Sequence, residues 1–195
     1  MESQYIGSTS GMEQQKEVKI ANQRGGVTRE SILRILALVL TLTASIVLGV
    51  GKQTEIVSIK LIPTLPPIDV PATAKWHYLS AFVYLVVADA IACTYAAFSL
   101  VLSFANRGTK NKLGLVIIVL DLSMVALLFS AIGSAGAIGL MGYQGNTHVQ
   151  WNKVCNVFGK FCHQVAASTA LSFLGSLAFF FLVVLAVLGH SRRSM

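Results

Sequence analysis

The chain has 195 residues, of which 54% are hydrophobic and only 12% are charged, and its formal net charge is +7. A soluble domain usually carries about 25% charged residues, so this composition excludes a water-soluble single-core protein and indicates a membrane protein. The positive charge does not indicate nucleic-acid binding, because the basic residues lie mostly in short segments that flank apolar runs.

Residues 1–30 form a polar segment with charges of both signs and a pair of glycines, Gly25 and Gly26. Such a segment cannot bury a core, and we expect it to be a disordered tail. No cleavable signal peptide is expected, because the first apolar run begins after this tail and is too long for a typical signal sequence.

Four apolar runs are each near or above the ~20 residues that a transmembrane helix requires. They cover residues 31–51, 77–104, 113–140 and 164–188. The runs are continuous and do not alternate as the strands of a membrane barrel do, so they predict an all-α fold, an integral membrane bundle of four transmembrane helices. The membrane domain is therefore expected over residues 31–188, followed by a short tail over 189–195. An even number of spans places both termini on the same side.

Lysine and arginine residues are unequally divided between the two sides of the predicted bundle. Ten of the 15 lie on the side of the termini, in the two tails, the start of the first span and the loop after the second span. Five lie in the two longer loops on the other side. Because positively charged residues are enriched in cytoplasmic segments, both termini are predicted to be cytoplasmic.

The first outer loop, residues 52–76, contains all four prolines of the chain. Proline restricts the backbone and lacks a donor N–H, so this loop is predicted to be extended and irregular. Trp76 and Tyr78 follow at the outer end of the second span, where interfacial aromatic residues are common.

Three ionisable residues lie within the predicted spans: Arg34, Asp89 and Asp121. Arg34 and Asp121 lie a few residues and about eight residues from the cytoplasmic ends of their spans, a difference in depth of roughly 7 Å at ~1.5 Å per residue. A long arginine side chain can bridge that gap, and an unpaired charge in hydrocarbon costs about 2.5–3.5 kcal/mol. We therefore predict an ion pair between Arg34 and Asp121, which would fix the register of the first helix against the third.

The alternative role for these charges is a proton or cation relay, for which intramembrane carboxylates are the usual parts. The helical face around Asp121 is apolar and disfavours a relay. Asp89 lies nearer the middle of the membrane and has no evident basic partner. Its state is left open between protonation and a hydrogen bond to another helix or subunit.

Small residues recur at four-residue spacing in all four spans, and such stripes let helices approach closely in lipid. The stripes consist of Ala37, Thr41, Ser45 and Gly49; Ala88, Ala92 and Ala96; Ala131, Ala135 and Gly139; Ser168, Ser172 and Ser176. They predict a tight bundle, with one stripe left for contacts between protomers.

The second outer loop carries the most concentrated polar chemistry of the chain. It contains His148, Trp151, Cys155, Cys162 and His163. By the predicted topology the two cysteines face an oxidising compartment, which favours a disulfide. The alternative is a metal site with the two histidines as further ligands, although the spacing matches no standard zinc pattern. We expect no metal or other cofactor, and no catalytic set, because bridged cysteines leave the histidines without a nucleophile.

Four segments, residues 33–54, 78–103, 119–155 and 157–183, together resemble the plant Casparian strip membrane domain protein-like (CASP-like) family, subfamily 1. The resemblance extends over roughly residues 28–188. In that family, and in the distantly similar MARVEL-type proteins, an arginine in the first span and an aspartate in the third are hallmarks, which Arg34 and Asp121 match. The tryptophan and cysteine pair of the second outer loop match Trp151, Cys155 and Cys162.

This resemblance implies a non-enzymatic scaffold of the plasma membrane. It would self-associate as a homodimer or higher homo-oligomer, or with related CASP-like proteins, into platforms that recruit cell-wall-modifying enzymes. Residues 60–79 do not resemble the first-outer-loop signature of the founding members, so a general scaffold is expected and not a role in the Casparian strip itself. A small four-span channel or transporter that uses Asp89 and Asp121 is the alternative from another class.

Overall fold

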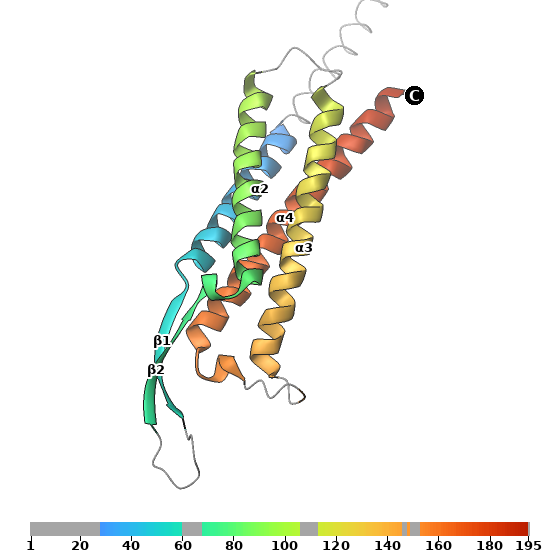
Figure 1. Cartoon of the computed structure of the whole chain (residues 1–195). Coiled ribbons are helices and arrows are strands. Elements are labelled where there is room, and N and C mark those ends of the chain that lie inside the picture. Colours follow the sequence, from blue (N-terminus) through green and yellow to red (C-terminus); the bar gives the residue numbers. More distant parts are fainter. Residues whose placement is uncertain (1–27, 60–67, 106–112, 146–147, 149–152, 195) are drawn as a thin grey trace, which may run out of the picture.

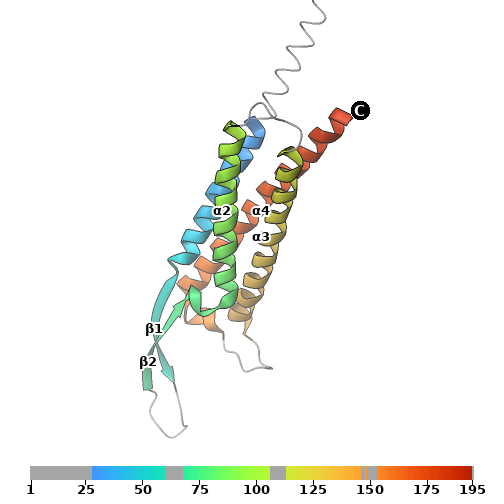
Figure 2. The same cartoon turned by 45° about the horizontal axis from the view of Figure 1, so that its top comes forward.

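The computed structural model describes residues 28–59, 68–105, 113–145, 148 and 153–194. Within these ranges, four helices are long and apolar enough to cross a membrane. They are the N-terminal helix, described over Thr28–Gly49, and helices α2 (Ser80–Ala105), α3 (Leu113–Gln144) and α4 (Gly159–Ser194). Figures 1 and 2 show them lying lengthwise beside one another as a bundle. The predicted all-α membrane fold is confirmed.

The start of the described chain and the carboxyl end of α4 lie at the same end of the bundle (Figure 1). The connections between the N-terminal helix and α2, and between α3 and α4, lie at the opposite end. The predicted tail over residues 1–30 falls almost entirely outside the described residues.

The first outer loop is a β-hairpin, so the prediction of an irregular loop is wrong for its described part. Strands β1 (Lys52–Ile59) and β2 (Ile68–Lys75) pair antiparallel, from Lys52 opposite Lys75 to Ile59 opposite Ile68. Threonine, isoleucine and valine favour this extended pairing. Pro71 is tolerated because each strand of a two-stranded ribbon is an edge strand. The other three prolines lie outside the described residues.

Three helix ends differ from the predicted spans by three to five residues, each for a local reason. Helix α2 starts at Ser80 because Trp76–Tyr78 form a 3-10 turn, η1. Helix α3 continues to Gln144 and is terminated by Gly145, whose φ of 71° and N–H bond to the Met141 carbonyl (2.9 Å) form a glycine C-cap. Helix α4 starts at Gly159, after a second 3-10 turn, η2 (Val154–Asn156).

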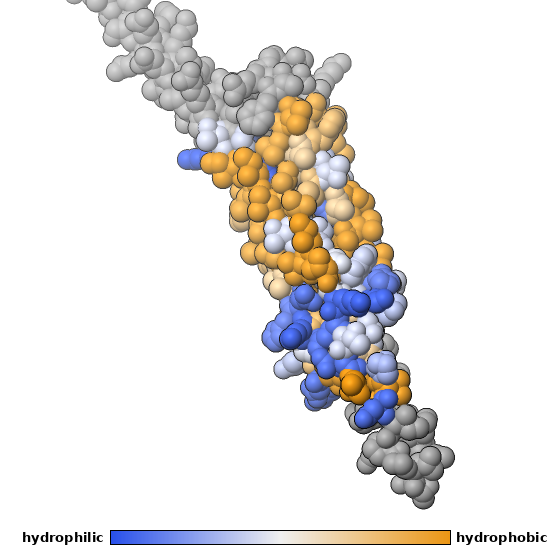
Figure 3. All heavy atoms as spheres, turned by 90° about the vertical axis from the view of Figure 1, so that its left-hand side faces the viewer, coloured by the Kyte–Doolittle hydropathy of each residue, from blue (hydrophilic) through white to orange (hydrophobic). Residues whose placement is uncertain are grey.

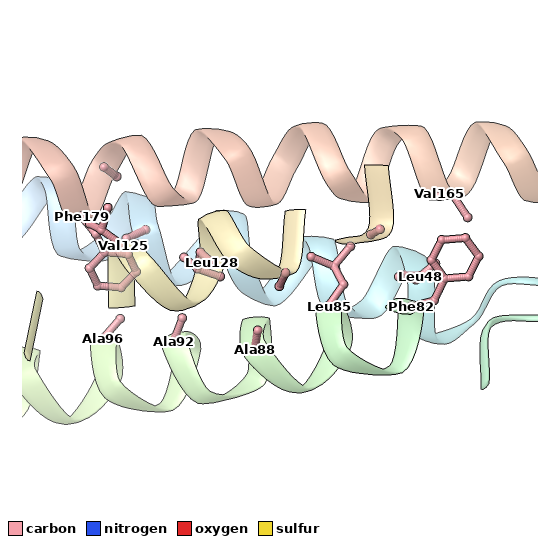
Figure 4. Packing of buried hydrophobic residues seen from close by; sticks show 14 of the residues in the cluster. Leu48, Phe82, Leu85, Ala88, Ala92, Ala96, Val125, Leu128, Val165 and Phe179 are labelled. Atoms are coloured by element: carbon pink, nitrogen blue, oxygen red, sulfur yellow. The ribbon is translucent and has the colours of Figure 1, made fainter. Parts of the chain in front are cut away.

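Alanine side chains recur in the core of the bundle and let the helices approach closely, beside larger buried residues such as Leu48, Phe82 and Leu128. In Figure 4, Ala88, Ala92 and Ala96 of α2 point toward the other helices, between Leu85 at one end and Phe179 at the other. The outer surface is a band of exposed apolar side chains (Figure 3), as expected for helices in contact with lipid.

The stripe predicted on the N-terminal helix is only partly correct. The buried positions are Ala37, Thr41, Ala44 and Leu48, whereas Ser45 is half-buried. Four residues turn an α-helix through about 400°, so a strict four-residue spacing drifts away from the core. The stripes of α2, α3 and α4 also face the interior of the single chain. None of these three stripes is therefore the free stripe that the sequence had predicted for contacts between protomers.

Candidate functional site

The centre of the candidate site is the pair that Arg34 and Asp121 form between the N-terminal helix and α3. Arg34 Nη2 lies 3.0 Å from Asp121 Oδ2, and Arg34 Nη1 lies 3.2 Å from Asp121 Oδ1. Their side chains are only 8% and 1% exposed. This two-point contact satisfies both carboxylate oxygens and fixes the orientation of the guanidinium plane.

Two side chains of α2, neither of them predicted from the sequence, complete the network. The Tyr95 hydroxyl donates to Asp121 Oδ1 at 2.7 Å, and Ser99 Oγ accepts from Arg34 Nη1 at 2.8 Å. Tyr95 and Ser99 are four residues apart and so lie on one face of the helix. Two polar residues at that spacing in an apolar span were the signal that could have identified them.

The network joins three helices and leaves no carboxylate oxygen of Asp121 without a donor. Val125 and Leu128 continue the same face of α3 as buried apolar residues. A proton or ion pathway needs a file of polar groups, whereas this cluster is bordered by hydrocarbon. The arrangement is suited to holding the helices in one register.

Asp89 forms a second buried contact, between α2 and α4. Ser172 Oγ donates to Asp89 Oδ2 at 2.6 Å. Asp89 Oδ1 is buried and has no hydrogen-bond partner among the described residues. For Asp89 the sequence left two possibilities open, protonation or a hydrogen bond to another helix or subunit, and the structure contains a hydrogen bond to another helix. Its donor, Ser172, belongs to the stripe of serines on α4.

Replacing Ser172 by alanine is expected to destabilise the bundle by about 1–3 kcal/mol, because Asp89 would lose its hydrogen-bond donor while remaining buried. Thermal unfolding of the purified chain in detergent micelles measures this. Thr169→Ala is the matched control, since among the described residues the Thr169 hydroxyl bonds only within its own helix, to the Val165 carbonyl. Equal stability of the two variants would contradict the role of Ser172.

A disulfide joins Cys155 of the second outer loop to Cys162, and their Cα atoms are 5.7 Å apart. Because α4 begins at Gly159, Cys162 and His163 lie in the first turns of this helix and not in the loop where they were expected. Both thiols are used in this bond, so they are not available as ligands for the alternative metal site. His148 and His163 are both exposed. Trp151 lies outside the described residues. The disulfide ties the loop to the bundle, because Cys162 belongs to α4.

Thiol counting tests this disulfide. The chain has three cysteines, and Cys93 is the free one in the structure. We expect the denatured, unreduced protein to react with one equivalent of maleimide and the reduced protein to react with three. The Cys162→Ser variant should lose about 2 kcal/mol of stability with its short cross-link. Three reactive thiols in unreduced protein from its native membrane would contradict the bond.

Four long apolar helices that enclose a buried ion pair, with a disulfide between a connecting loop and α4, define a polytopic helical membrane protein. The chain belongs to the Casparian strip membrane protein family, because residues 23–178 match the family model described as "Casparian strip membrane protein domain".

Relatives in several plants are similar over nearly the whole chain. CASP-like protein 1E2 of Vitis vinifera is 60% identical over 196 residues, which covers 99% of this chain and 100% of the relative. CASP-like protein 1E1 of Populus trichocarpa is 55% identical over 100% of both chains. CASP-like protein 1E2 of Arabidopsis thaliana is 54% identical over 95% of this chain and 97% of its own. No solved structure gives a significant match. The predicted membership of subfamily 1 is thus confirmed.

Proposed function

We propose that this protein is a non-enzymatic scaffold of the plasma membrane, which self-associates into platforms and recruits cell-wall-modifying proteins. The main observation behind the proposal is where the polar side chains of the membrane helices lie. Arg34, Ser99 and Asp121 are buried, and the partly buried Tyr95 donates to Asp121, so these side chains are engaged in contacts that hold helices together. Membership of the Casparian strip membrane protein family supports the same function.

The proposal includes an orientation and a set of partners. Both termini lie in the cytoplasm, with tails over residues 1–30 and 189–195 and a membrane domain over 31–188. The β-hairpin and the disulfide loop then face the cell wall. The partners are further copies of this chain and related CASP-like proteins. Unequal distribution of lysine and arginine supports this orientation.

Fluorescence recovery after photobleaching in the native plasma membrane tests the scaffold. The tagged protein is expected to form patches that recover far more slowly than a lipid-anchored marker of similar size, because assembled copies diffuse together. Recovery as fast and as uniform as that of the marker would contradict the proposal. Co-precipitation of two differently tagged copies from the same membrane checks self-association independently.

The position of Asp89 supports a second candidate function, that of a small channel or transporter. Its Oδ1 atom is a buried acceptor with no hydrogen bond among the described residues, and intramembrane carboxylates often mark ion pathways. This function predicts flux of protons or monovalent cations into vesicles that contain the purified chain, and loss of that flux in Asp89→Asn. An absence of flux above that of empty vesicles would exclude it.

A further inference from the structure

Two lysines lie directly opposite each other at the base of the β-hairpin. Lys52, the first residue of β1, is the pairing partner of Lys75, the last residue of β2. Opposed residues of an antiparallel pair have Cβ atoms about 4.5–5.5 Å apart on the same face, where like charges are destabilising. The hairpin thus places two lysine side chains side by side at its base, where repulsion between their charges opposes the pairing of the strands.

Two hydroxyl groups lie beside these lysines. Side chains alternate between the faces of a strand, so Thr54 and Thr73 share the face of Lys52 and Lys75. Thr54 Oγ1 lies 3.1 Å from Thr73 Oγ1. Lys75 Nζ lies 5.6 Å from the centre of the Tyr78 ring, a residue that is 62% exposed. Ammonium and hydroxyl donors gathered on one surface are the groups that bind phosphate oxygens.

No carboxylate neutralises this face among the described residues, where neither Lys52 nor Lys75 forms an ion pair. Glu55 stands on the opposite face of the hairpin and accepts a hydrogen bond from Gln53 Nε2 at 3.0 Å. Asp69 shares the lysine face but lies six residues from Lys75, about 20 Å along the strand. The two ammonium charges are therefore available to an external anion.

The lysine face is turned away from α4. Gln53 Oε1 accepts a hydrogen bond from the backbone N–H of Phe161 in α4 at 2.8 Å, so the Gln53 face of β1 is the one directed at the helix. Lys52 is on the other face of the same strand. The hydrogen bond also fixes the base of the hairpin against the first turn of α4.

The lysine face also lies close to the level at which the apolar helices end. Lys52 follows Gly49 of the N-terminal helix by three residues, at most about 10 Å of extended chain, and Lys75 is separated from α2 mainly by η1. Figure 3 shows hydrophilic side chains gathered immediately beyond the apolar band. Lipid headgroups occupy this depth, so their phosphates are the nearest anions.

We propose that Lys52, Thr54, Thr73 and Lys75 form a binding site for the phosphate of an anionic lipid headgroup. An anionic lipid is favoured over a zwitterionic one because the choline cation of the latter repels the lysines. The bound phosphate also relieves the repulsion between Lys52 and Lys75, so anionic lipid stabilises the base of the hairpin.

Native mass spectrometry of the full chain in detergent micelles, titrated with short-chain phosphatidylserine or phosphatidylcholine, tests the site. The native chain is expected to bind phosphatidylserine more tightly, and Lys52→Gln/Lys75→Gln to weaken the first binding step at least about fivefold, since one lysine near a membrane surface contributes about that factor. Lys52→Arg/Lys75→Arg keeps both charges and should bind as the native chain does.

Lys153→Gln is the matched control, because it removes an exposed lysine at the same end of the bundle but outside the hairpin. It should leave the affinity unchanged. The proposal is overturned if the double glutamine variant binds phosphatidylserine as tightly as the native chain, or if Lys153→Gln weakens binding equally. Equal affinity for the two lipids, with tight binding of a soluble oligogalacturonate, would instead assign the site to an acidic polysaccharide and overturn the lipid assignment.

Discussion

Replacing Asp121 by leucine is expected to destabilise the bundle by about 3–5 kcal/mol, the largest effect of any single substitution in the network. The change leaves the Arg34 guanidinium buried with only Ser99 as a partner, and an uncompensated buried charge costs about this much. It also removes the nearer acceptor of the Tyr95 hydroxyl, which is left with the Ile117 carbonyl at 3.3 Å. Reversible unfolding of the purified chain in mixed micelles measures the difference.

Two further variants separate the charge from the packing. Asp121→Asn retains an oxygen that accepts from Arg34 and Tyr95, so its loss should be smaller than that of Asp121→Leu. The double variant Arg34→Leu/Asp121→Leu contains no buried charge and should be more stable than Asp121→Leu alone, because buried ion pairs are often replaced by apolar residues with little loss. If Asp121→Leu and Asp121→Asn were both as stable as the native chain, the ion pair would not be what holds the helices together.

Replacing Gly175 by leucine is expected to cost about 3 kcal/mol of stability, because it inserts a bulky side chain where α4 packs tightly against the N-terminal helix. A Cβ at Gly175 would already lie 3.0 Å from Thr41 Cγ2 and 3.7 Å from Leu40 Cβ. Thr41 is fully buried, and its hydroxyl bonds to the Ala37 carbonyl at 2.9 Å, so it has little room to move. Overpacking of this kind typically costs 1–3 kcal/mol or more.

The control for this prediction is Gly133→Leu in α3, where no atom lies within 4 Å of the position of the new Cβ. Gly133 is exposed on the outer surface of the bundle, so the leucine would contact lipid, and stability should change by no more than about 0.5 kcal/mol. The same unfolding measurement applies. A larger loss for Gly133→Leu than for Gly175→Leu would contradict the packing described for α4.

The four spans could be predicted from sequence because a run of ~20 apolar residues has only one common structure in a bilayer, a helix that satisfies its own backbone hydrogen bonds. Arg34 and Asp121 stood out for a related reason: a charge in such a run is costly, and their depths are similar. Ser172 was recognised only as one of several small residues, because a hydroxyl does not reveal from sequence which helix it faces.

The β-hairpin shows where sequence reasoning failed. Four prolines suggested an irregular loop, but three of them lie between the two paired strands and Pro71 lies on a strand with an open edge. Strand pairing depends on the register between distant residues, such as Lys52 and Lys75, and that register is not visible in either strand alone.

The sequence by itself determined that this chain is a four-helix membrane protein with a buried charge pair, since hydrophobic length and the cost of a lone charge in lipid are properties of single segments. Only the tertiary structure decided which polar groups meet: Tyr95 and Ser99 with the ion pair, Ser172 with Asp89, and two lysines on one face of a hairpin. The physical reason is that the rotation of each helix and the register of each strand are set by packing among all the elements at once.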